Sequence, residues 1–457
     1  MYIIGLNAFH GDSSACLLKD GHLVGAAEEE RFRRIKHWAG FPSEAIKWCL
    51  FEAGINLEDV EHVALNQNTK ANFGRKIMFT LNNRPSLKML LDRFQNKRKR
   101  LDIKDQLLKA FPNSKFNGSI HSVEHHTAHL SSAFHISHFS KAVVVSIDGF
   151  GDFASSAWGI GQGIKIDLED RVYFPHSLGI FYQALTQFIG FHNYGDEYKV
   201  MGLAPYGRPL YIEQMREIVK LNSDGRYELN LNYFRHHREK IDYEWENGSP
   251  YVGTLFSHDL EKLLGPARTK DQELTQKYKD IANSVQTMYE EAFFHLLNKL
   301  YEKYNLDNLA IAGGCAMNSV ANGKVLLKTP FKKIYVQAAA GDAGGAIGAA
   351  MMTWHKIGGE KSKKRIAPHN HAYWGPSFTN DYIDNLLKSQ KDRIEKENFI
   401  IENFSEISQL AKFTAAEIEK GKVIGWFQGK MEWGPRALGN RSIICDPRRS
   451  DMKDILS

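Results

Sequence analysis

The sequence predicts an α/β protein with two similar α/β lobes followed by a smaller α/β domain. The chain has 457 residues, which exceeds the roughly 250–300 residues at which a single hydrophobic core stops growing. A unit of strand, glycine-polar loop and returning strand occurs at residues 2–19 and again at residues 142–160. A helical segment follows each unit, which is typical of sheets covered by helices. We therefore expect two lobes that face each other across a cleft.

The first unit begins at the N-terminus. Residues 2–8 and 14–19 have the apolar pattern of two strands, and the polar loop 10–13 separates them. Asp20-Gly21 predicts a hairpin turn into a third strand. Residues 42–53 then predict a helix. The first lobe should thus start with an antiparallel sheet.

The second unit repeats this order. Residues 142–147 predict a buried strand, residues 148–152 a tight loop and residues 155–160 the returning strand. Residues 179–189 predict the helix that follows. The remaining predicted elements are helices at 271–304 and 407–420 and strands at 309–312 and 423–427.

A linker is predicted before the C-terminal region. Residues 358–365 combine glycine and charge and lack apolar periodicity, which is typical of an exposed linker. We therefore predict one domain at residues 1–365 and a second at residues 371–457.

Composition narrows the classes of function. Lys and Arg number 59 against 53 Asp and Glu, a net charge of +6 that suits phosphate-bearing small molecules. The basic run 97–100 lies among Gln and Asn, so we expect a solvated face there and no nucleic-acid partner. No basic leader and no bilayer-length apolar run occurs, so we expect a cytoplasmic protein without a membrane partner. The four scattered cysteines argue against a disulfide framework. The sequence does not decide whether the protein forms a homodimer.

Two histidines predict a metal site. If their segment is helical, His125 and His129 lie on one face with about 5–6 Å between their Cβ atoms. Asp148 and Asp342 each follow a β-rich run, and such strand ends are where α/β folds place ligands. Two imidazoles and two carboxylates suit Fe(II), Mn(II) or Zn(II) without choosing among them. The alternative is that the two histidines are surface or capping residues.

Two glycine loops predict a nucleotide site. Gly313 and Gly314 follow a strand and allow a base or ribose to approach the backbone, where Asn318 can form a hydrogen bond. The loop at Gly341 precedes an Ala-rich helix and offers amides for phosphate. Neither loop is a P-loop, because no GxxxxGK[ST] occurs. Purely structural tight turns are the alternative.

Four further residues are candidate catalytic groups. His10 shares the first loop with Asp12, and an imidazole with its ordinary pKa near 6.5 can act as the general base for an acceptor hydroxyl. A hydrogen-bonded loop histidine is the alternative. Glu197 and Lys199 are closely spaced opposite charges that orient a substrate or pair with each other.

An anion site is predicted near the C-terminus. Arg436 and Arg441 lie in a frame of glycine and proline, and the planar guanidinium suits phosphate or carboxylate. Ser442 offers a further donor. The alternative is that both arginines are solvated surface charges.

Together these motifs resemble the O-carbamoyltransferase family of nodulation-factor and antibiotic biosynthesis, the tobramycin, cephem and novobiocin type. The resemblance covers essentially the whole chain, and it is the combination of motifs that is specific. The motifs lie at residues 28–32, 125–129, 148–152, 177–182, 197–207, 313–318, 341–344 and 434–442.

The resemblance implies a fold and a two-step reaction. The N-terminal domain would have the actin- and hexokinase-like architecture, and a YrdC-like C-terminal domain would make carbamoyladenylate from carbamoyl phosphate and ATP with Mg²⁺. The N-terminal domain would then transfer the carbamoyl group to a hydroxyl of a small acceptor such as an antibiotic or a sugar. The family's iron ligands would map onto the four predicted metal ligands, and its early-loop histidine onto His10. Because family members continue beyond residues 434–442 whereas this chain ends at Ser457, we expect an incomplete second domain and an impaired first step.

Three other functions remain open. A threonylcarbamoyl-adenosine synthesis protein, with tRNA as the acceptor, shares the superfamily but normally lacks the appended domain. A metallopeptidase is disfavoured because position 126 is His126 and not the Glu of HExxH. The third is a non-catalytic ATP-binding regulatory module.

Overall fold

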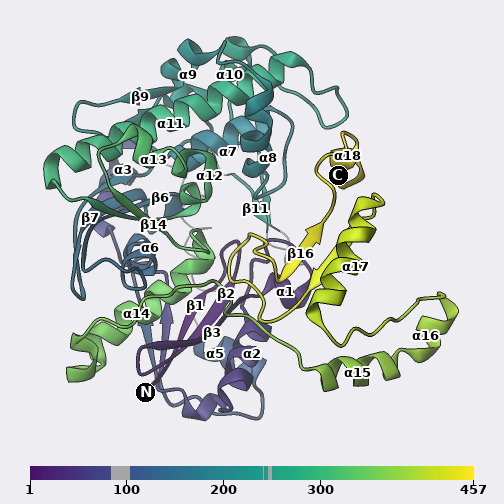
Figure 1. Cartoon of the computed structure of the whole chain (residues 1–457). Coiled ribbons are helices and arrows are strands. Elements are labelled where there is room, and N and C mark those ends of the chain that lie inside the picture. The colour runs from purple at the N-terminus through teal and green to yellow at the C-terminus, as the bar shows by residue number, and fades with distance from the viewer. Residues whose placement is uncertain (84–102, 240, 245–249, 457) are drawn as a thin grey trace. The chain divides into compact units, whose positions relative to one another are not determined.

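The computed structural model of the chain describes residues 1–83, 103–239, 241–244 and 250–456 (Figure 1). The chain forms two compact units, Met1–Asn370 and His371–Ser457, and each is described by itself. The basic run 97–100 lies outside the described residues. In the part of the chain that the structure describes, no helix combines the length and the apolar character needed to cross a bilayer.

The first lobe of the N-terminal unit is built on a five-stranded sheet with the order β3-β2-β1-β4-β5. β1, β2 and β3 are antiparallel neighbours, whereas β4 and β5 run parallel to β1. Both faces of β1 are buried, since α14 covers β1, β2 and β4 while α2 packs on β2 and β3. The strands and the two helices are β1 (Tyr2–Asn7), β2 (Ser14–Lys19), β3 (His22–Glu28), β4 (His62–Leu65), β5 (Ser119–Ser122), α2 (Ser43–Ala53) and α14 (Gly345–Ile357).

The second lobe repeats this topology. Its sheet has the order β14-β13-β6-β7-β8, with β6, β7 and β8 antiparallel and with β13 and β14 parallel to β6. In both sheets, three antiparallel strands begin at one edge, β3-β2-β1 or β8-β7-β6, and two parallel strands follow, β4-β5 or β13-β14. The predicted duplication of α/β lobes is thus confirmed. The strands are β6 (Lys141–Gly151), β7 (Ala154–Gln162), β8 (Lys165–Tyr173), β13 (Asn308–Ala312) and β14 (Lys333–Val336).

Helix α6 (His125–Phe134) packs against α14 and also contacts β6 and β13 of the second sheet. A glycine makes this approach possible, because a Cβ at Gly348 would lie 1.7 Å from the backbone oxygen of Ala128. The main hydrophobic core lies in the second lobe, where α7 (Leu178–Phe188) and α11 (Gln276–Tyr304) pack with β6.

The remaining helices and strands of the N-terminal unit are α1 (Glu30–Arg33), α3 (Phe73–Asn83), α5 (Ile103–Ala110), α8 (Glu197–Leu203), α9 (Ile212–Ile218), β9 (Val219–Leu221), β10 (Tyr227–Leu229), β11 (Tyr243–Glu244), β12 (Tyr251–Val252), α10 (His258–Leu264), α12 (Ser319–Asn322) and α13 (Val325–Lys328). The strands and helices predicted at residues 2–8, 14–19, 42–53 and 309–312 agree with the observed elements within one or two residues.

The predicted linker at residues 358–365 is more ordered than expected. The charged side chains of residues 360–364 are exposed, but residues Gly359–Lys363 form a 3-10 helix with Ser362 buried. Arg365 anchors its end, since the guanidinium donates to the backbone oxygens of Gly163, Phe134 and Ser137 at 2.8–3.0 Å. Composition predicted the solvated side chains but not these bonds to distant carbonyls, so the prediction of an exposed linker was wrong for Ser362 and Arg365.

The C-terminal unit contains a two-stranded antiparallel sheet, β15-β16, with Met431 and Trp433 buried. The predicted helix at residues 407–420 and the predicted strand at residues 423–427 are both present. The elements are α15 (Asn380–Ser389), α16 (Lys391–Lys396), α17 (Ile407–Glu419), β15 (Ile424–Phe427), β16 (Arg441–Ile444) and α18 (Met452–Leu456).

Candidate metal centre and active site

Helix α6 supplies the two histidines of the predicted metal site. The Glu124 carboxylate caps its start by accepting hydrogen bonds from the backbone N–H and the hydroxyl of Thr127 at 2.8 and 2.7 Å. His125 and His129 lie one turn apart and buried, with 3.1 Å between their Nε2 atoms. Gly151 leaves room for the first ring, because a Cβ there would lie 2.0 Å from His125.

Asp148 faces both imidazoles from β6, within a stretch where the pairing of β6 with β7 shifts register. Its Oδ2 lies 3.1 Å from His125 Nε2 and 2.9 Å from His129 Nε2. Its Oδ1 accepts hydrogen bonds from the backbone N–H groups of Gly149 and Gly314 at 2.7 and 3.1 Å. The two amides fix the carboxylate so that one oxygen faces the histidines.

Asp342 is the fourth residue of the cluster and lies in the turn Asp342–Gly344, which precedes α14. Its Oδ1 lies 3.6 Å from His125 Nε2 and 3.5 Å from His129 Nε2. This oxygen is buried and has no hydrogen-bond partner in the part of the chain that the structure describes. One ligand atom from each of the four residues lies within 4.8 Å of the others. Four side chains from distant parts of the sequence therefore converge as predicted.

The set fits a divalent ion. Bonds of about 2.0–2.2 Å to nitrogen and oxygen place neighbouring ligand atoms roughly 3–3.5 Å apart in tetrahedral or octahedral geometry. The separations between the imidazole nitrogens and the carboxylate oxygens run from 2.9 to 3.6 Å. The Asp342 oxygen, which accepts no hydrogen bond among the described residues, could also bind such an ion. Neither observation selects iron over manganese or zinc.

The pKa values of the cluster residues depend on one another. Burial lowers the pKa of His125, but the bond to Asp148 and the charge of Asp342 outweigh burial and raise the pKa to about 10. For His129, burial and the charge of His125 lower the pKa, yet the hydrogen bond to Asp148 and the facing carboxylate of Asp342 raise it overall. Burial raises the pKa of Asp148, while the two imidazoles hold it well below its ordinary value. A cation that binds here therefore replaces protons on the histidines.

His126 lies on the same helix, but its environment differs from that of His125 and His129. It is fully buried, and its Nδ1 lies 2.9 Å from the hydroxyl of Ser146. Burial and the charge of His125 lower its pKa to about 4, so this imidazole is neutral at physiological pH. The hydrogen bond to Ser146 and the neutrality of the ring indicate a structural residue.

The first loop lies beside the cluster. The ring of His10 is 5.9 Å from the ring of His125, between centroids, which places the predicted base next to the metal ligands. Asp12 bonds to a residue that the sequence did not point to, since its Oδ1 lies 2.7 Å from His37 Nδ1. These two residues are 25 positions apart, and no spacing signal could have paired them.

Glu197 and Lys199 do not pair with each other. Lys199 Nζ forms an ion pair with Asp196 at 2.8 Å. Burial raises the pKa of Glu197 to about 7, and His37 and Asp12 are among the charged groups near it. Glu197 therefore titrates near physiological pH beside the first loop.

The first of the two glycine loops supports Asp148. Gly313 has φ +94°, and a Cβ there would lie 2.2 Å from the backbone oxygen of Ile147. The N–H of Gly314 donates to Asp148. The side chain of Asn318 caps α12 through Ala321 N at 3.0 Å and donates to Gln286 at 2.9 Å. Met317 lies 3.3 Å from where a Cβ of Gly341 would be. Binding of a nucleotide by these loops stays a prediction.

In the C-terminal unit, the side chain of Arg441 bonds to backbone carbonyls of the same unit. Its guanidinium donates to the carbonyls of Gln428, Asn440, Pro376 and Gly429, at distances up to 3.2 Å, and stacks 3.5 Å from the centroid of a phenylalanine ring in β15. These bonds favour a structural role over the predicted capture of an anion.

Its neighbours in the same loop differ. Arg436 is exposed. The hydroxyl of Ser442 accepts a hydrogen bond from the backbone N–H of Gly439 at 3.0 Å. Anion binding by Arg436 and Ser442 stays a prediction.

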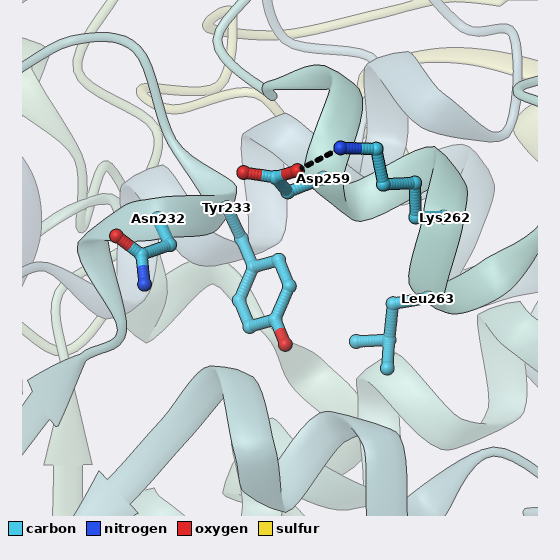
Figure 2. A pocket seen from close by; sticks show the side chains of 5 residues that line it. All are labelled: Asn232, Tyr233, Asp259, Lys262 and Leu263. Atoms are coloured by element: carbon cyan, nitrogen blue, oxygen red, sulfur yellow. Dashed lines mark hydrogen bonds and ion pairs between the residues drawn. The ribbon is translucent and has the colours of Figure 1, made fainter.

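A shallow depression of about 350 Å³ lies elsewhere in the second lobe. It is lined by Asn232, Tyr233, Asp259, Lys262 and Leu263 (Figure 2). Its two charged residues pair with each other at 2.7 Å, as the dashed line in Figure 2 shows. None of the residues predicted for the active site lines it, so we assign it no role.

The fold and the cluster define an α/β protein of duplicated lobes with a candidate metal centre. Residues 2–351 match the family "Carbamoyltransferase N-terminus" and residues 415–457 match "Carbamoyltransferase C-terminus". The chain belongs to the carbamoyltransferase family, and the predicted resemblance is confirmed.

Similar proteins agree with this assignment. An uncharacterised protein of Synechocystis sp. is 37% identical over 100% of this chain and 73% of its own length. Nodulation protein NolNO of Sinorhizobium fredii is 34% identical over 98% of this chain, which spans 60% of that protein. The 3'-hydroxymethylcephem-O-carbamoyltransferase of Streptomyces clavuligerus is 29% identical over 33% of this chain and 25% of its own length.

Solved structures are similar at lower identity. HypF of T. kodakarensis is 12% identical with a TM-score of 0.38, covering 80% of this chain and 49% of that one. The ROK hexokinase of Thermus thermophilus is also 12% identical, with a TM-score of 0.37, covering 77% of this chain and 98% of that one.

Proposed function

We propose that the protein catalyses metal-dependent transfer of a carbamoyl group to a hydroxyl of a small acceptor such as an antibiotic or a sugar. The carbamoyl group would come from carbamoyl phosphate through an adenylate made with ATP and Mg²⁺. The observation that carries the proposal is the convergence of His125, His129, Asp148 and Asp342 in the part of the chain that matches the carbamoyltransferase N-terminus.

Each group would have a distinct role. The four ligands would hold a divalent ion, which supplies a Lewis acid for the charge that develops on the carbamoyl oxygen and the adenylate phosphate. His10 would take the proton of the acceptor hydroxyl, because it lies beside His125 and its ordinary pKa is close to the working pH. Glu197, with a pKa raised to about 7, and Lys199 would orient the substrates next to the first loop.

The adenylate-forming step is assigned to the C-terminal unit, which would belong to a YrdC-like domain. Its region 415–457 matches the carbamoyltransferase C-terminus. Arg436 is the basic group of this loop that is exposed. We therefore assign contact with a phosphate to Arg436, with Ser442 beside it, and a structural role to Arg441.

Two measurements test the proposal. The purified protein, prepared with and without Fe(II), Mn(II) or Zn(II), is given ATP and carbamoyl phosphate, and carbamoyl-dependent pyrophosphate release is measured. Carbamoylated products are then sought by mass spectrometry with aminoglycosides, chito-oligosaccharides and cephems as acceptors. Supplying carbamoyladenylate directly separates transfer from the first step. Equal transfer by the chelator-treated protein would exclude the metal from catalysis.

A further inference from the structure

A second pair of side chains involves the loop that carries His10 and has no role in the proposed mechanism. Asp12 in the first loop and His37 beyond α1 form an Asp–His pair, with 2.7 Å between Oδ1 and Nδ1. Both side chains are about four-fifths shielded from solvent, being 24% and 18% exposed. The backbone N–H of His37 donates to the Glu30 carboxylate at 2.7 Å, which fixes the residue from its other side.

The segment that carries His37 holds the two ends of the first loop. The N–H of Phe9 donates to the carbonyl of Gly40 at 3.0 Å, and the N–H of Ser13 donates to the carbonyl of Trp38 at 2.9 Å. The Ser13 hydroxyl lies 2.8 Å from the same Gly40 carbonyl. The two ends of the loop are therefore tied to residues 38–40, whereas its middle depends on other contacts.

The middle of the loop has an unusual backbone conformation. Asp12 has φ +57° and His37 has φ +57°, the left-handed region that non-glycine residues rarely adopt. Tyr194 packs edge-on against the His37 ring at 5.5 Å and closely against Gly11, where a Cβ would lie 2.5 Å from the tyrosine. Such conformations persist where surrounding contacts hold them, and they are frequent at active sites.

From these contacts we propose that His37 is a positioning residue, which holds Asp12 through Nδ1 and so fixes the loop that places His10 beside His125. The bond crosses from residue 37 to the middle of the loop, two positions from His10. The contacts of His37 are with Asp12, Glu30 and Tyr194, so we assign it no direct contact with the proposed metal ligands or the reacting groups. Its effect on turnover rests on the proposed function, because only carbamoyl transfer would use His10 as the base.

Two substitutions separate the side-chain bond from the backbone conformation. His37→Asn keeps a nitrogen donor at the place of Nδ1, and asparagine tolerates the left-handed region. His37→Gly accepts the backbone conformation but has no donor. If the bond is what matters, His37→Asn should keep kcat within about threefold, whereas His37→Gly should lower kcat at least about tenfold with a smaller change in KM for the acceptor.

A second measurement does not depend on turnover. NMR of the full chain labelled at histidine should show a nuclear Overhauser effect between the rings of His10 and His125 in the native protein and in His37→Asn, and its loss in His37→Gly. Equal kcat and equal ring contacts in the two variants would overturn the proposal. Equal loss in both would also overturn it, because the imidazole and not the bond would then be required. If the native protein transfers no carbamoyl group, the proposed function fails while the ring contact still decides the role of His37.

Discussion

The metal cluster of the N-terminal unit and the arginine loop of the C-terminal unit use their charged groups in opposite ways. The nitrogens of His125 and His129 face two carboxylates, and one oxygen of Asp342 accepts no hydrogen bond among the described residues. Arg441 instead donates to four carbonyls of its own chain. Both regions show charged residues near glycines in the sequence. Only the hydrogen-bond partners distinguish charged groups that could bind a ligand from charged groups that bond to their own chain.

Removing a ligand of the cluster should have the largest effect. We expect His129→Ala to lose the bound divalent ion and to lower turnover roughly 10²- to 10³-fold, the loss typical of removing one group that stabilises developing charge. Metal content after reconstitution, measured by elemental analysis, and kcat for transfer from carbamoyladenylate check this. The matched control is His126→Asn, which keeps a donor toward Ser146 and should retain full metal content. A metal loss that is equal in both variants would refute the assignment of ligands.

Glu197 should make stability depend on pH. Its pKa is raised from an ordinary value of 4.5 to about 7, so the folded protein holds one more proton than the unfolded chain between these values. The free energy of unfolding should therefore fall as pH rises across this window, by roughly 2–3 kcal/mol in total, and then level off. Glu197→Gln should remove this fall, as measured by urea unfolding at several pH values. Glu213→Gln, at an exposed position on α9, should leave the fall unchanged.

The contact between α6 and α14 should be the next most sensitive feature. Gly348→Ala places a methyl group 1.7 Å from the backbone oxygen of Ala128, so the helices must move apart at a cost of about 1–3 kcal/mol. Because α6 carries two ligands and α14 follows Asp342, the affinity for the ion should also fall. Gly202→Ala on α8 meets open space and should be neutral or slightly stabilising. Thermal unfolding and metal titration measure both changes, and equal stability of the two variants would contradict the close contact.

The smallest effect is expected in the arginine loop. Arg441→Lys keeps the charge but loses the planar fork that reaches several carbonyls, so β15 and β16 should be destabilised by roughly 1 kcal/mol. Hydrogen exchange of the amides in these two strands measures the change. Arg436→Lys at an exposed position should leave this exchange unaltered. Similar exchange in the two variants would mean that Arg441 is not structural.

Much of the fold could be predicted because it depends on local patterns. The strands at residues 2–8 and 142–147 read as apolar runs beside glycine-polar loops, and their repetition predicted the duplicated lobes. The spacing of His125 and His129 predicted two ligands on one helix face. The two carboxylates were predicted because each follows a β-rich run of sequence, although the structure places Asp148 within β6.

Other features depend on contacts between distant residues. No pattern links Asp12 to His37 or Arg365 to the carbonyls near residue 134. Asn318 is predicted to meet a nucleotide, which stays a prediction, and no pattern indicated that its side chain also caps α12 and bonds to Gln286. A side chain with several donors can serve a ligand or its own backbone, and the sequence does not distinguish the two uses.

Hydrophobic periodicity and turn residues act over short distances, so the element order, the duplication and the kinds of chemical groups could be predicted from the residues alone. Which charged groups remain available to bind a ligand depends instead on contacts between distant segments. The tertiary structure brings Asp148 and Asp342 to the two histidines and closes the guanidinium of Arg441 onto carbonyls. Hydrogen-bond satisfaction is a property of the whole fold, since each buried polar atom must find its partner wherever the chain places one.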